Sequence, residues 1–307
     1  MSEGQVTPRQ AVIALMKGAV PERADDIDSL WARYDPDVVL SDDSRHITLN
    51  ACKERITVSA KTMDVFWLIG FSGWRAIECY SPHVVISAAG GGTVADLMRA
   101  DEELGEVERA YKERIAAVQD LIAAPDATSS PWPPDLPRPS ADREAMEDMQ
   151  YKSAFDLSCL AAAFTYFHEF RHVMLDRDNE RPGDLREEEM ACDVWARSFL
   201  TAHLAQYALK NGHIYQDVLR KRSMGLAVAA LILHEITPLW EQGGNCQYFS
   251  LADRLHALLD NTPLPANDHF WIFAASLLIG ILRQRHIAIN APQSGARELA
   301  LYLLAKP

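Results

Sequence analysis

Five consecutive residues, His168-Glu169-Phe170-Arg171-His172, combine side chains that can bind a metal ion and accept a proton. Positions i and i+4 share one face of an α-helix, so both imidazoles can reach a single ion. Glu169 lies about 100° around the helix from His168, where its carboxylate can act as a general base on a nearby water. The apolar run 157–167 predicts the helix that this geometry needs. The motif therefore predicts a zinc hydrolase site.

Two histidines do not complete such a site, because catalytic zinc uses three protein ligands and leaves one position for water. A helix predicted to begin near residue 185 carries Glu189 and Asp193 four residues apart, above apolar residues on the same face. Glu189 is the predicted third ligand. Asp193 is predicted to accept a hydrogen bond from the second ring nitrogen of a ligand histidine.

Other residues of that helix compete for these roles. Glu188 in place of Glu189 has Cys192 at i+4, and that face offers no second carboxylate, so Glu189 is preferred. Cys192 could itself bind zinc, although a thiol beside Trp195 is more typical of packing. Glu187 and Glu188 are interpreted as charges at the start of the helix, where the helix dipole favours acids.

A second His-Glu pair opens the stretch His234-Glu235-Ile236-Thr237-Pro238, but proline stands where the second histidine would be. His234 is interpreted as a core or helix-cap residue and remains a weaker candidate for stabilising a transition state. A hydrolase of this kind also needs a hydrogen-bond donor for the oxyanion. The sequence leaves five candidates open for that donor: Tyr166, His203, Tyr207, His213 and His234.

The periodicity of the chain predicts an α+β fold that is predominantly helical. An antiparallel hairpin is predicted with strands at 45–49 and 55–59, and 83–87 is predicted to be a strand. The glycines at 90–92 are interpreted as a turn, with Thr93 as the N-cap of a helix. Helices are predicted over residues 8–17, 28–34, 63–80, 94–123, 142–174, 185–210, 214–236, 249–260, 268–287 and 294–305.

Five prolines within residues 131–139 make the clearest break in the chain, because proline cannot continue a helix or a central strand. This stiff connection separates a sheet-bearing N-terminal lobe, about 1–128, from a helical lobe with the zinc site, about 140–307. Both lobes are predicted to form one domain, 1–307.

Composition excludes several classes of protein. The chain has 307 residues, of which 48% are hydrophobic, and this apolar fraction argues against disorder. Its formal net charge of −13 argues against binding to nucleic acid or an anionic membrane. The apolar runs 225–233 and 270–282 are shorter than the roughly 18 to 20 residues of a membrane span. Five scattered cysteines without a CxxC pair, in a chain without a signal-peptide pattern, predict a cytoplasmic protein. The oligomeric state is left open.

HEFRH followed by Glu189-x-x-x-Asp193 resembles the gluzincin metallopeptidases, and residues 47–80 add a similarity to the family of the phage-exclusion (Lit-type) peptidase. The resemblance implies Zn²⁺ bound by His168, His172 and Glu189, with Glu169 as catalytic base and Asp193 as the orienting carboxylate. It also implies a zincin-like fold, in which the edge strand of a small antiparallel sheet, the hairpin near 45–59, lies over the active-site helix.

One residue departs from the family pattern. The two positions between the glutamate and the second histidine are usually uncharged, and here one of them is Arg171. Arg171 must therefore turn away from the metal or pair with an acid such as one of 187–189.

The leading hypothesis is a zinc-dependent endopeptidase that hydrolyses a peptide bond in a protein substrate, and the Lit-type resemblance adds a role in bacterial phage defence. Arg171 and the unidentified oxyanion donor motivate an alternative, a catalytically silent peptidase-like sensor or interaction protein. A third hypothesis is metal-dependent hydrolysis of a substrate other than a peptide.

Overall fold

Helices make up most of the chain, and they form where apolar residues recur at helical spacing. The computed structural model describes residues 6–139, 142–260 and 262–306. Residues 140 and 141, at the start of the predicted helical lobe, lie outside the described residues. The helices are α1 (Pro8–Ala19), the short 3-10 helix η1 (Pro21–Arg23), α2 (Ala24–Tyr34), α3 (Ala60–Ala88), α4 (Val94–Ala100), α5 (Leu104–Ala123), α6 (Met149–Arg177), α7 (Leu185–Thr201), α8 (Leu204–Asn211), α9 (Tyr215–Ile236), α10 (Leu251–Leu259), α11 (His269–Gln284) and α12 (Ala296–Leu304).

The described residues contain one small sheet of three strands, β1 (Asp37–Leu40), β2 (Leu49–Cys52) and β3 (Arg55–Val58), in the order β1-β3-β2. β2 pairs antiparallel with β3, whereas β1 pairs with β3 in parallel. The sheet is therefore mixed, which corrects the predicted antiparallel sheet. The predominantly helical α+β class is confirmed.

The hairpin exists, but its first strand is shifted from the prediction. β2 occupies residues 49–52, of which 50–52 were predicted to belong to the turn at 50–53, and the chain reverses at Lys53 and Glu54 instead. Lys53 adopts a left-handed φ of 55°, as the tight turn requires. Residues 45–48 form a loop because side chains of α3 and the preceding Ser59 hold their backbone groups.

The strand predicted at 83–87 is wrong, because α3 continues through Pro82 to Ala88. His83, Val84 and Ser87 are buried while Val85 and Ile86 are exposed. Burial at i, i+1 and i+4 follows the helical period rather than the alternation of a strand. The β-branched composition favours a strand locally, but packing of one helical face against the core prevails.

Three predicted helices have different boundaries in the structure, and each difference occurs at a polar residue. The helix predicted to 123 is divided into α4 and α5 at Asp101, whose carboxylate accepts hydrogen bonds from the N–H groups at the start of α5. The helix predicted over 185–210 is divided at His203, which has a left-handed φ of 62°. α6 begins at Met149 rather than 142, where the side chain of Asp148 caps it.

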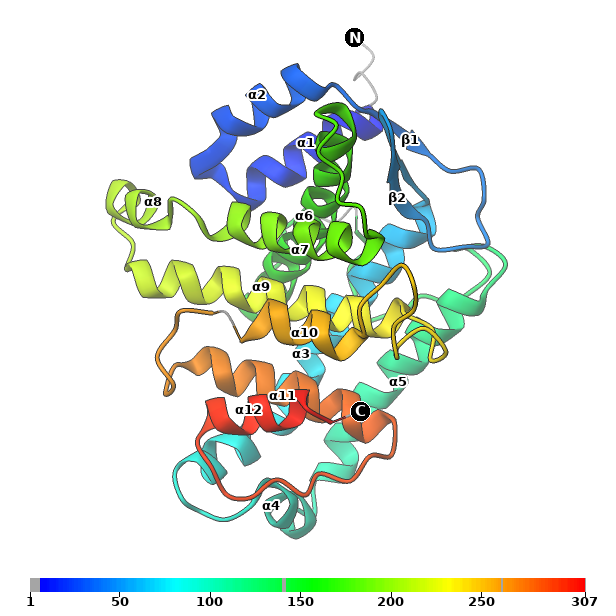
Figure 1. Ribbon diagram of the computed structural model, residues 1–307. Coiled ribbons are helices and arrows are strands. Elements are labelled where there is room, and N and C mark those ends of the chain that lie inside the picture. The colour runs from blue at the N-terminus through cyan, green and yellow to red at the C-terminus, as the bar shows by residue number, and fades with distance from the viewer. Residues whose placement is uncertain (1–5, 140–141, 261, 307) are drawn as a thin grey trace.

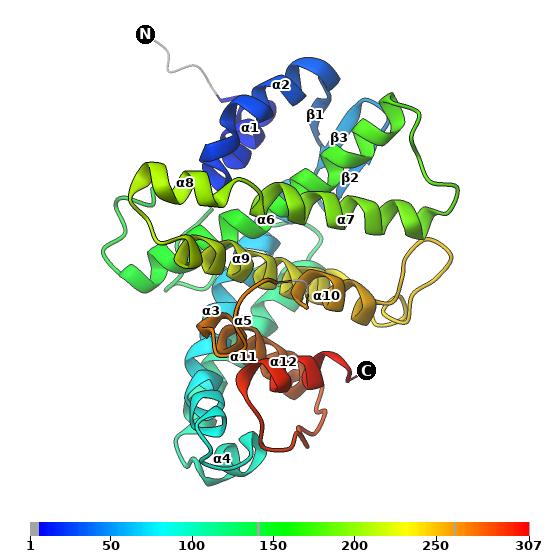
Figure 2. The same ribbon diagram turned by 60° about the vertical axis from the view of Figure 1, so that its left-hand side comes forward.

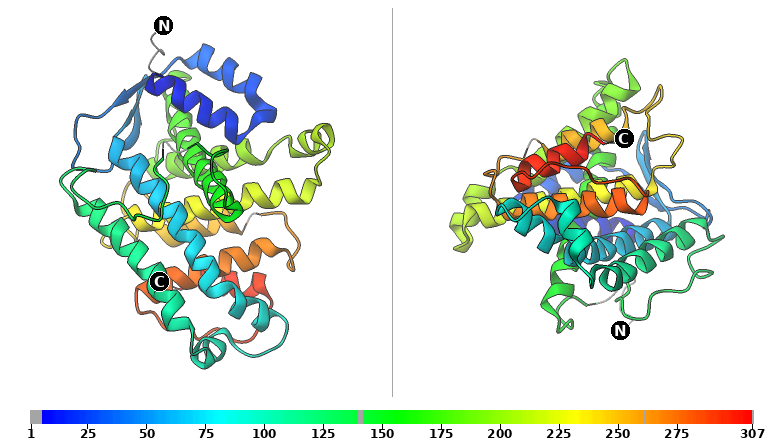
Figure 3. Two further views of the ribbon diagram at one scale, coloured as in Figure 1. Left: turned by 180° about the vertical axis from the view of Figure 1, so that it is seen from behind. Right: turned by 90° about the horizontal axis from the view of Figure 1, so that it is seen from below.

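α6 forms the centre of the molecule, with α7 and α9 lying across it, and α10, α11 and α12 follow below α9 in the view of Figure 1. Figure 2 shows α7 in front of α6. Seen from behind in Figure 3, α3 and α5 run side by side. α3 packs against α6 and α11 as well, so one apolar core joins the two predicted lobes. The description of 1–307 as a single domain stays a prediction.

Helices α6 and α9 approach closely because Gly225 has no side chain. A Cβ atom at that position would lie 2.5 Å from Cβ of Leu160 on α6. Such a contact fixes the two helices against each other, and α6 carries the HEFRH motif about two turns after Leu160.

The apolar runs 225–233 and 270–282, which were predicted to be too short to span a membrane, lie in α9 and α11. Within the described part of the chain, no helix combines the length and apolar character needed to cross a membrane.

Candidate metal centre

Helix α6 brings the two histidines of the motif together in the interior of the protein. His168 and His172 are 6% and 8% exposed, and their Nε2 atoms lie 3.2 Å apart. The one-turn spacing explains this geometry, because the side chains at i and i+4 lie one above the other on the same helix face. The imidazole edges that carry Nε2 are thus directed at one point.

Helix α7 supplies the acid that faces the same point. One carboxylate oxygen of Glu189 lies 3.3 Å from Nε2 of His168, and the other lies 3.3 Å from Nε2 of His172. The ligand atoms of these three residues all lie within 4.8 Å of one another, so the group could hold a metal ion. The structure therefore brings together the three side chains that were predicted as ligands.

A second carboxylate orients each histidine. Oδ1 of Asp193 is 2.8 Å from Nδ1 of His168, as expected for the orienting acid. Oε1 of Glu188 is 2.7 Å from Nδ1 of His172, a contact that the sequence analysis did not identify. An acid on Nδ1 fixes the ring and leaves Nε2 free to bind a ligand.

The interpretation of Glu188 as a helix-start charge is corrected by this contact, and its side chain is buried. Glu188 and Glu189 are about 100° apart on α7, so the two acids can reach opposite sides of one imidazole. The need of His172 for its own carboxylate was the signal that could have identified Glu188. Cys192 is buried and lies outside the group of ligand atoms that could hold the ion.

Glu169 lines the same cavity beside the two histidines. Removal from bulk water raises the pKa of its carboxyl group, and this effect exceeds the opposing attraction of His168 and His172. The backbone N–H of Ala51 in β2 donates a hydrogen bond to Glu169. Glu169 is therefore held between the histidines and the sheet.

β2 lies at an edge of the sheet and next to α6. Thr48 accepts a hydrogen bond from Ser59, so by the antiparallel alternation Asn50 also pairs with β3. The same alternation directs the peptide groups of Leu49 and Ala51 away from β3, toward the cavity that both residues line. An extended polypeptide could pair with these groups.

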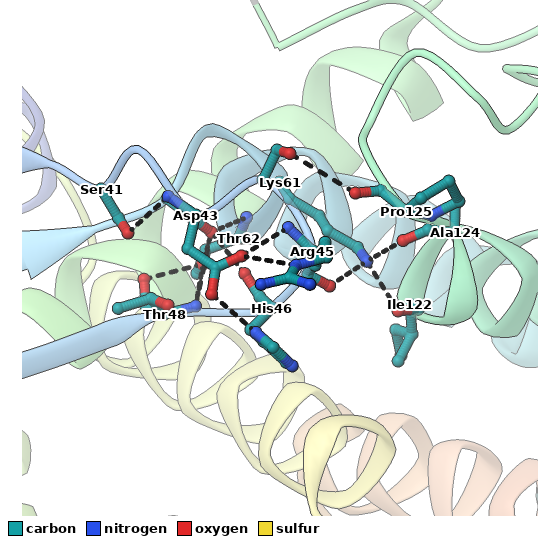
Figure 4. Close-up of polar contacts among 12 residues, drawn as sticks. Ser41, Asp43, Arg45, His46, Thr48, Lys61, Thr62, Ile122, Ala124 and Pro125 are labelled. Carbon is teal, nitrogen blue, oxygen red and sulfur yellow. Dashed lines mark hydrogen bonds and ion pairs between the residues drawn. The ribbon is translucent and has the colours of Figure 1, made fainter.

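The segment before β2 is fixed by a buried lysine. Figure 4 shows Nζ of Lys61 donating hydrogen bonds to the carbonyl oxygens of Arg45, Ile122 and Ala124, each at 2.7 Å. Thr62 donates to the carbonyl oxygen of Thr48 at 2.8 Å. These contacts tie the loop before β2 to α3 and to the end of α5.

Arginines that the sequence analysis did not identify stand beside the acids. Nε and Nη2 of Arg254, on α10, lie 2.8 and 3.0 Å from the carboxylate of Asp193, and Nη2 lies 3.8 Å from Glu189. Nε of Arg181 lies 3.9 Å from Glu188. Arg254 is about 60 residues from Asp193 in the sequence, and no local pattern connects the two.

The electrostatic environment favours a positive charge between the imidazoles. Because each Nδ1 donates to a carboxylate, two neutral rings would direct the lone pairs of their Nε2 atoms at each other. Burial is the largest single effect on His168 and would lower its pKa, but Asp193, Glu189 and Glu169 together outweigh burial and raise the pKa to about 10. The two histidines hold the pKa of Glu189 well below its usual range, although burial opposes this.

The charges of the cavity fit a divalent cation. Five carboxylates and two guanidinium groups line the cavity that holds the two imidazoles, which leaves a local net charge of about −3 when the rings are neutral. A bound divalent cation would neutralise most of this charge, and two histidine nitrogens with one carboxylate oxygen are a donor set that zinc accepts. The five acids are Glu169, Glu188, Glu189, Asp193 and Glu241, and the two bases are Arg181 and Arg254.

Arg171 does not enter the cavity. Its Nη2 lies 4.0 Å from Glu180, and its guanidinium group lies 5.9 Å from the centre of the Trp195 ring. The expectation that Arg171 turns away from the site is confirmed. Its partner is Glu180 rather than one of the acids at 187–189.

The five predicted oxyanion donors lie elsewhere. The Tyr166 hydroxyl donates to Sδ of Met63, and none of the five is among the residues that line the cavity within the described chain: Tyr166, His203, Tyr207, His213 and His234. Tyr248 lines it instead, from the α9–α10 loop (residues 237–250). Burial, followed by the charge of Glu189, raises the pKa of Tyr248, so its hydroxyl stays protonated and can donate.

The cavity has a volume of about 570 Å³. Its acidic wall is opposed by an apolar wall from α3, α6 and α9 that includes Phe66, Phe164, Ala229 and Ile232. Two exposed apolar residues, Leu239 and Trp240, lie in the α9–α10 loop that borders it. The site thus combines buried charge with room for an apolar side chain.

The comparison with protein families identifies the class of protein. A family model described as Peptidase U49 matches residues 56–274, most of the chain. The chain belongs to the peptidase U49 family. Membership indicates a hydrolase that acts on peptide bonds, so its substrate is a polypeptide. The match includes the residues of the metal centre on α6 and α7 and excludes β1, β2 and α12.

The other two comparisons gave no match. No curated protein and no solved structure matches this member of the U49 family.

Proposed function

We propose that this U49 peptidase is a zinc-dependent endopeptidase. The observation that carries the proposal is the arrangement of His168, His172 and Glu189, with a further carboxylate on Nδ1 of each histidine. That pattern is the one expected of a metal ligand set rather than of buried histidines in general. Zinc bound there would polarise the scissile carbonyl and lower the pKa of the attacking water.

The side chains of the protein perform the proton transfers and the binding. The carboxylate of Glu169 accepts a proton from the attacking water and then delivers it to the nitrogen of the leaving amine. Its raised pKa suits a group that must hold the proton between these two events. The Tyr248 hydroxyl donates a hydrogen bond to the oxyanion.

The free edge of β2 binds the substrate backbone in an extended conformation. The N–H and C=O of Leu49 and the C=O of Ala51 pair with it, because the N–H of Ala51 is donated to Glu169, and the apolar wall accepts one of its side chains. Backbone pairing within a chain does not require a free terminus, which supports an endopeptidase.

The proposal extends to the biological setting of the sequence resemblance. It places the protein with the gluzincins, in the Lit-type family, with cleavage of a host protein during phage defence in the cytoplasm. The five cysteines are free, which is compatible with a reducing compartment.

The catalytically silent alternative rested on Arg171 and on the missing oxyanion donor. Arg171 lies beside Trp195, outside the cavity, and Tyr248 lines the cavity. Neither observation now favours a silent protein over an active peptidase.

Substitution of the base tests the proposal directly. Glu169→Gln removes proton acceptance while preserving shape, and we expect peptide hydrolysis to fall by about 10²- to 10⁴-fold while zinc content is unchanged. Cleavage of a denatured protein such as casein, followed by mass spectrometry, measures the effect. Glu187→Gln, at an exposed position of α7, is the matched control. A Glu169→Gln protein that cleaves as fast as the wild type would rule out this mechanism.

A further inference from the structure

A second cavity, called here the C-terminal cavity, lies between α9, α10, α11 and α12. Its volume is about 300 Å³. At roughly 20 to 30 Å³ for each non-hydrogen atom, it accommodates about ten to fifteen of them. It is separate from the metal centre, because none of the ligand residues lines it.

The lining of the C-terminal cavity combines an apolar wall with positive charge. Leu255, Leu278 and Ile281 contribute to the wall, while Arg285 and Lys306 are the charged residues. No aspartate or glutamate is among the described residues that line it. This is unusual in a chain with 43 acidic and 30 basic residues, and it makes the cavity complementary to an anion with an apolar tail.

His234 provides an independent indication of a ligand. The residue is 5% exposed and lines the cavity, and its Nε2 atom has no hydrogen-bond partner among the described residues. Its Nδ1 faces Oε1 of Glu235 at 3.0 Å, and Gln119 donates to the other oxygen of that carboxylate. The ring is therefore oriented by an acid on one nitrogen, while the other nitrogen is buried without a partner, which is costly.

We propose that the C-terminal cavity binds a small amphipathic anion with a carboxylate or phosphate head and an apolar tail of about eight carbon atoms. The head lies among Arg285, Lys306 and His234, whose Nε2 is buried without a partner among the described residues. The tail lies against the leucine-rich wall. A volume of about 300 Å³ suits a ligand of this size, so the proposed ligand is a free small molecule.

The α9–α10 loop connects this cavity with the metal centre. Gln242 and Ser250 of the loop line the C-terminal cavity, while Glu241 and Tyr248 line the site cavity. Arg285 also contacts the side chain of Gln242. An anion bound there therefore changes the position of Tyr248, a consequence that rests on the proposed peptidase function.

Calorimetric titration of the full-length protein tests the binding. The probes are octanoate and octyl phosphate, which distinguish the two head groups, octanamide as the neutral analogue, and acetate as a head without a tail. We expect at least one of the two anions to bind at least tenfold more tightly than octanamide and acetate. Absence of binding by both anions, or equal binding of octanamide, would overturn the proposal.

Variants locate the ligand. Arg285→Gln and Lys306→Gln should each weaken binding of the anion at least tenfold, whereas Arg99→Gln, which removes an exposed arginine on α4, should not. Because Arg285 contacts Gln242, a thermal melt checks that its variant is folded, and Lys306→Gln provides the second test. Unchanged binding in both variants places the ligand elsewhere and overturns the assignment.

Activity is a separate readout. We expect octanoate to change kcat/KM for casein at least twofold in the wild type and not in Arg285→Gln. Binding without this change overturns only the coupling through the α9–α10 loop. Loss of all activity in the wild type without ligand contradicts the proposed peptidase function, and the calorimetric result stands apart from it.

Discussion

The sequence contains two His-Glu pairs, and the structure surrounds them differently. His168 and His234 are both buried near the end of a long helix, and each has a carboxylate on Nδ1. For His168 that acid is Asp193 from another helix, and Nε2 faces a second histidine and Glu189. For His234 the acid is the adjacent Glu235, and Nε2 has no partner in the described chain.

The difference shows that a His-Glu pair acquires its chemistry from the neighbouring helix. α7 delivers three acids to the end of α6, two for the imidazoles' Nδ1 atoms and one for their Nε2 atoms. Pro238 occupies the position one turn after His234, where a second histidine would stand, and α9 ends two residues before it at Ile236. The second pair is thus left facing a cavity with basic residues instead of acidic ones.

Removing one histidine from each pair should give the largest contrast. Three ligands share an apparent zinc binding energy of roughly 12 kcal/mol, so His168→Ala should weaken zinc binding by about a thousandfold or more. His234→Ala should retain wild-type affinity. Competition with a chelator of known affinity measures both. Equal zinc affinity in the two variants would remove the distinction between the pairs.

Among the residues that the structure describes, the strand over the first pair has no counterpart at the second, and Lys61 fixes the loop before that strand. Lys61→Met leaves three partly buried carbonyl oxygens without their donor, so we expect a loss of about 3 kcal/mol in the free energy of unfolding. Urea denaturation measures it, with Lys53→Met in the exposed turn as the control. A loss below about 1 kcal/mol would indicate that the loop before β2 is held by other contacts.

The acids that accept from Nδ1 should contribute less to zinc affinity than the ligands themselves. Asp193→Asn and Glu188→Gln should each lower zinc affinity by about 10- to 100-fold, because the histidines lose orientation and basicity. Glu187→Gln should have no effect. Elemental analysis after dialysis against a graded chelator series separates these outcomes. If only Asp193→Asn reduces zinc content, Glu188 is a helix-start charge after all.

Low pH can release the metal or unfold the protein. Glu108, which lies outside the metal centre, indicates the pH range in which unfolding begins to contribute. Burial opposes ionisation of Glu108, but hydrogen bonds from Arg283, Lys112 and Tyr80 lower its pKa to about 2. A lowered pKa in the folded state stabilises the protein above the unfolded pKa near 4.5, and the benefit is lost as the pH falls toward 2.

After allowance for solvent screening, this contribution is about 1 kcal/mol. Denaturant unfolding at pH 6 and at pH 3 measures it, and Glu108→Gln should reduce the difference between the two. A pH dependence that is unchanged in Glu108→Gln would assign acid sensitivity to other carboxylates.

Local patterns predicted much of the helical framework. The apolar periodicity located α1, α9, α10, α11 and α12 to within a few residues, because burial of one face is a property of the segment itself. The strand at 83–87 and the first hairpin strand were wrong, since tertiary packing of His83 and Val84 and the hydrogen bonds of Lys61 decided those segments. β1 was not predicted, because its four residues form a strand only by pairing with β3.

The spacing of His168, Glu169 and His172 on one helix was readable in the sequence, and so was the acid pair Glu189 and Asp193, because a helix converts i and i+4 into neighbours. The sequence alone determined which residue types could share a face. Only the tertiary structure decided that α7 meets α6 in the register that gives Glu188 to His172, and that Arg254 and Tyr248 reach the same cavity. Those contacts join segments far apart in the chain, where no periodicity relates one residue to another.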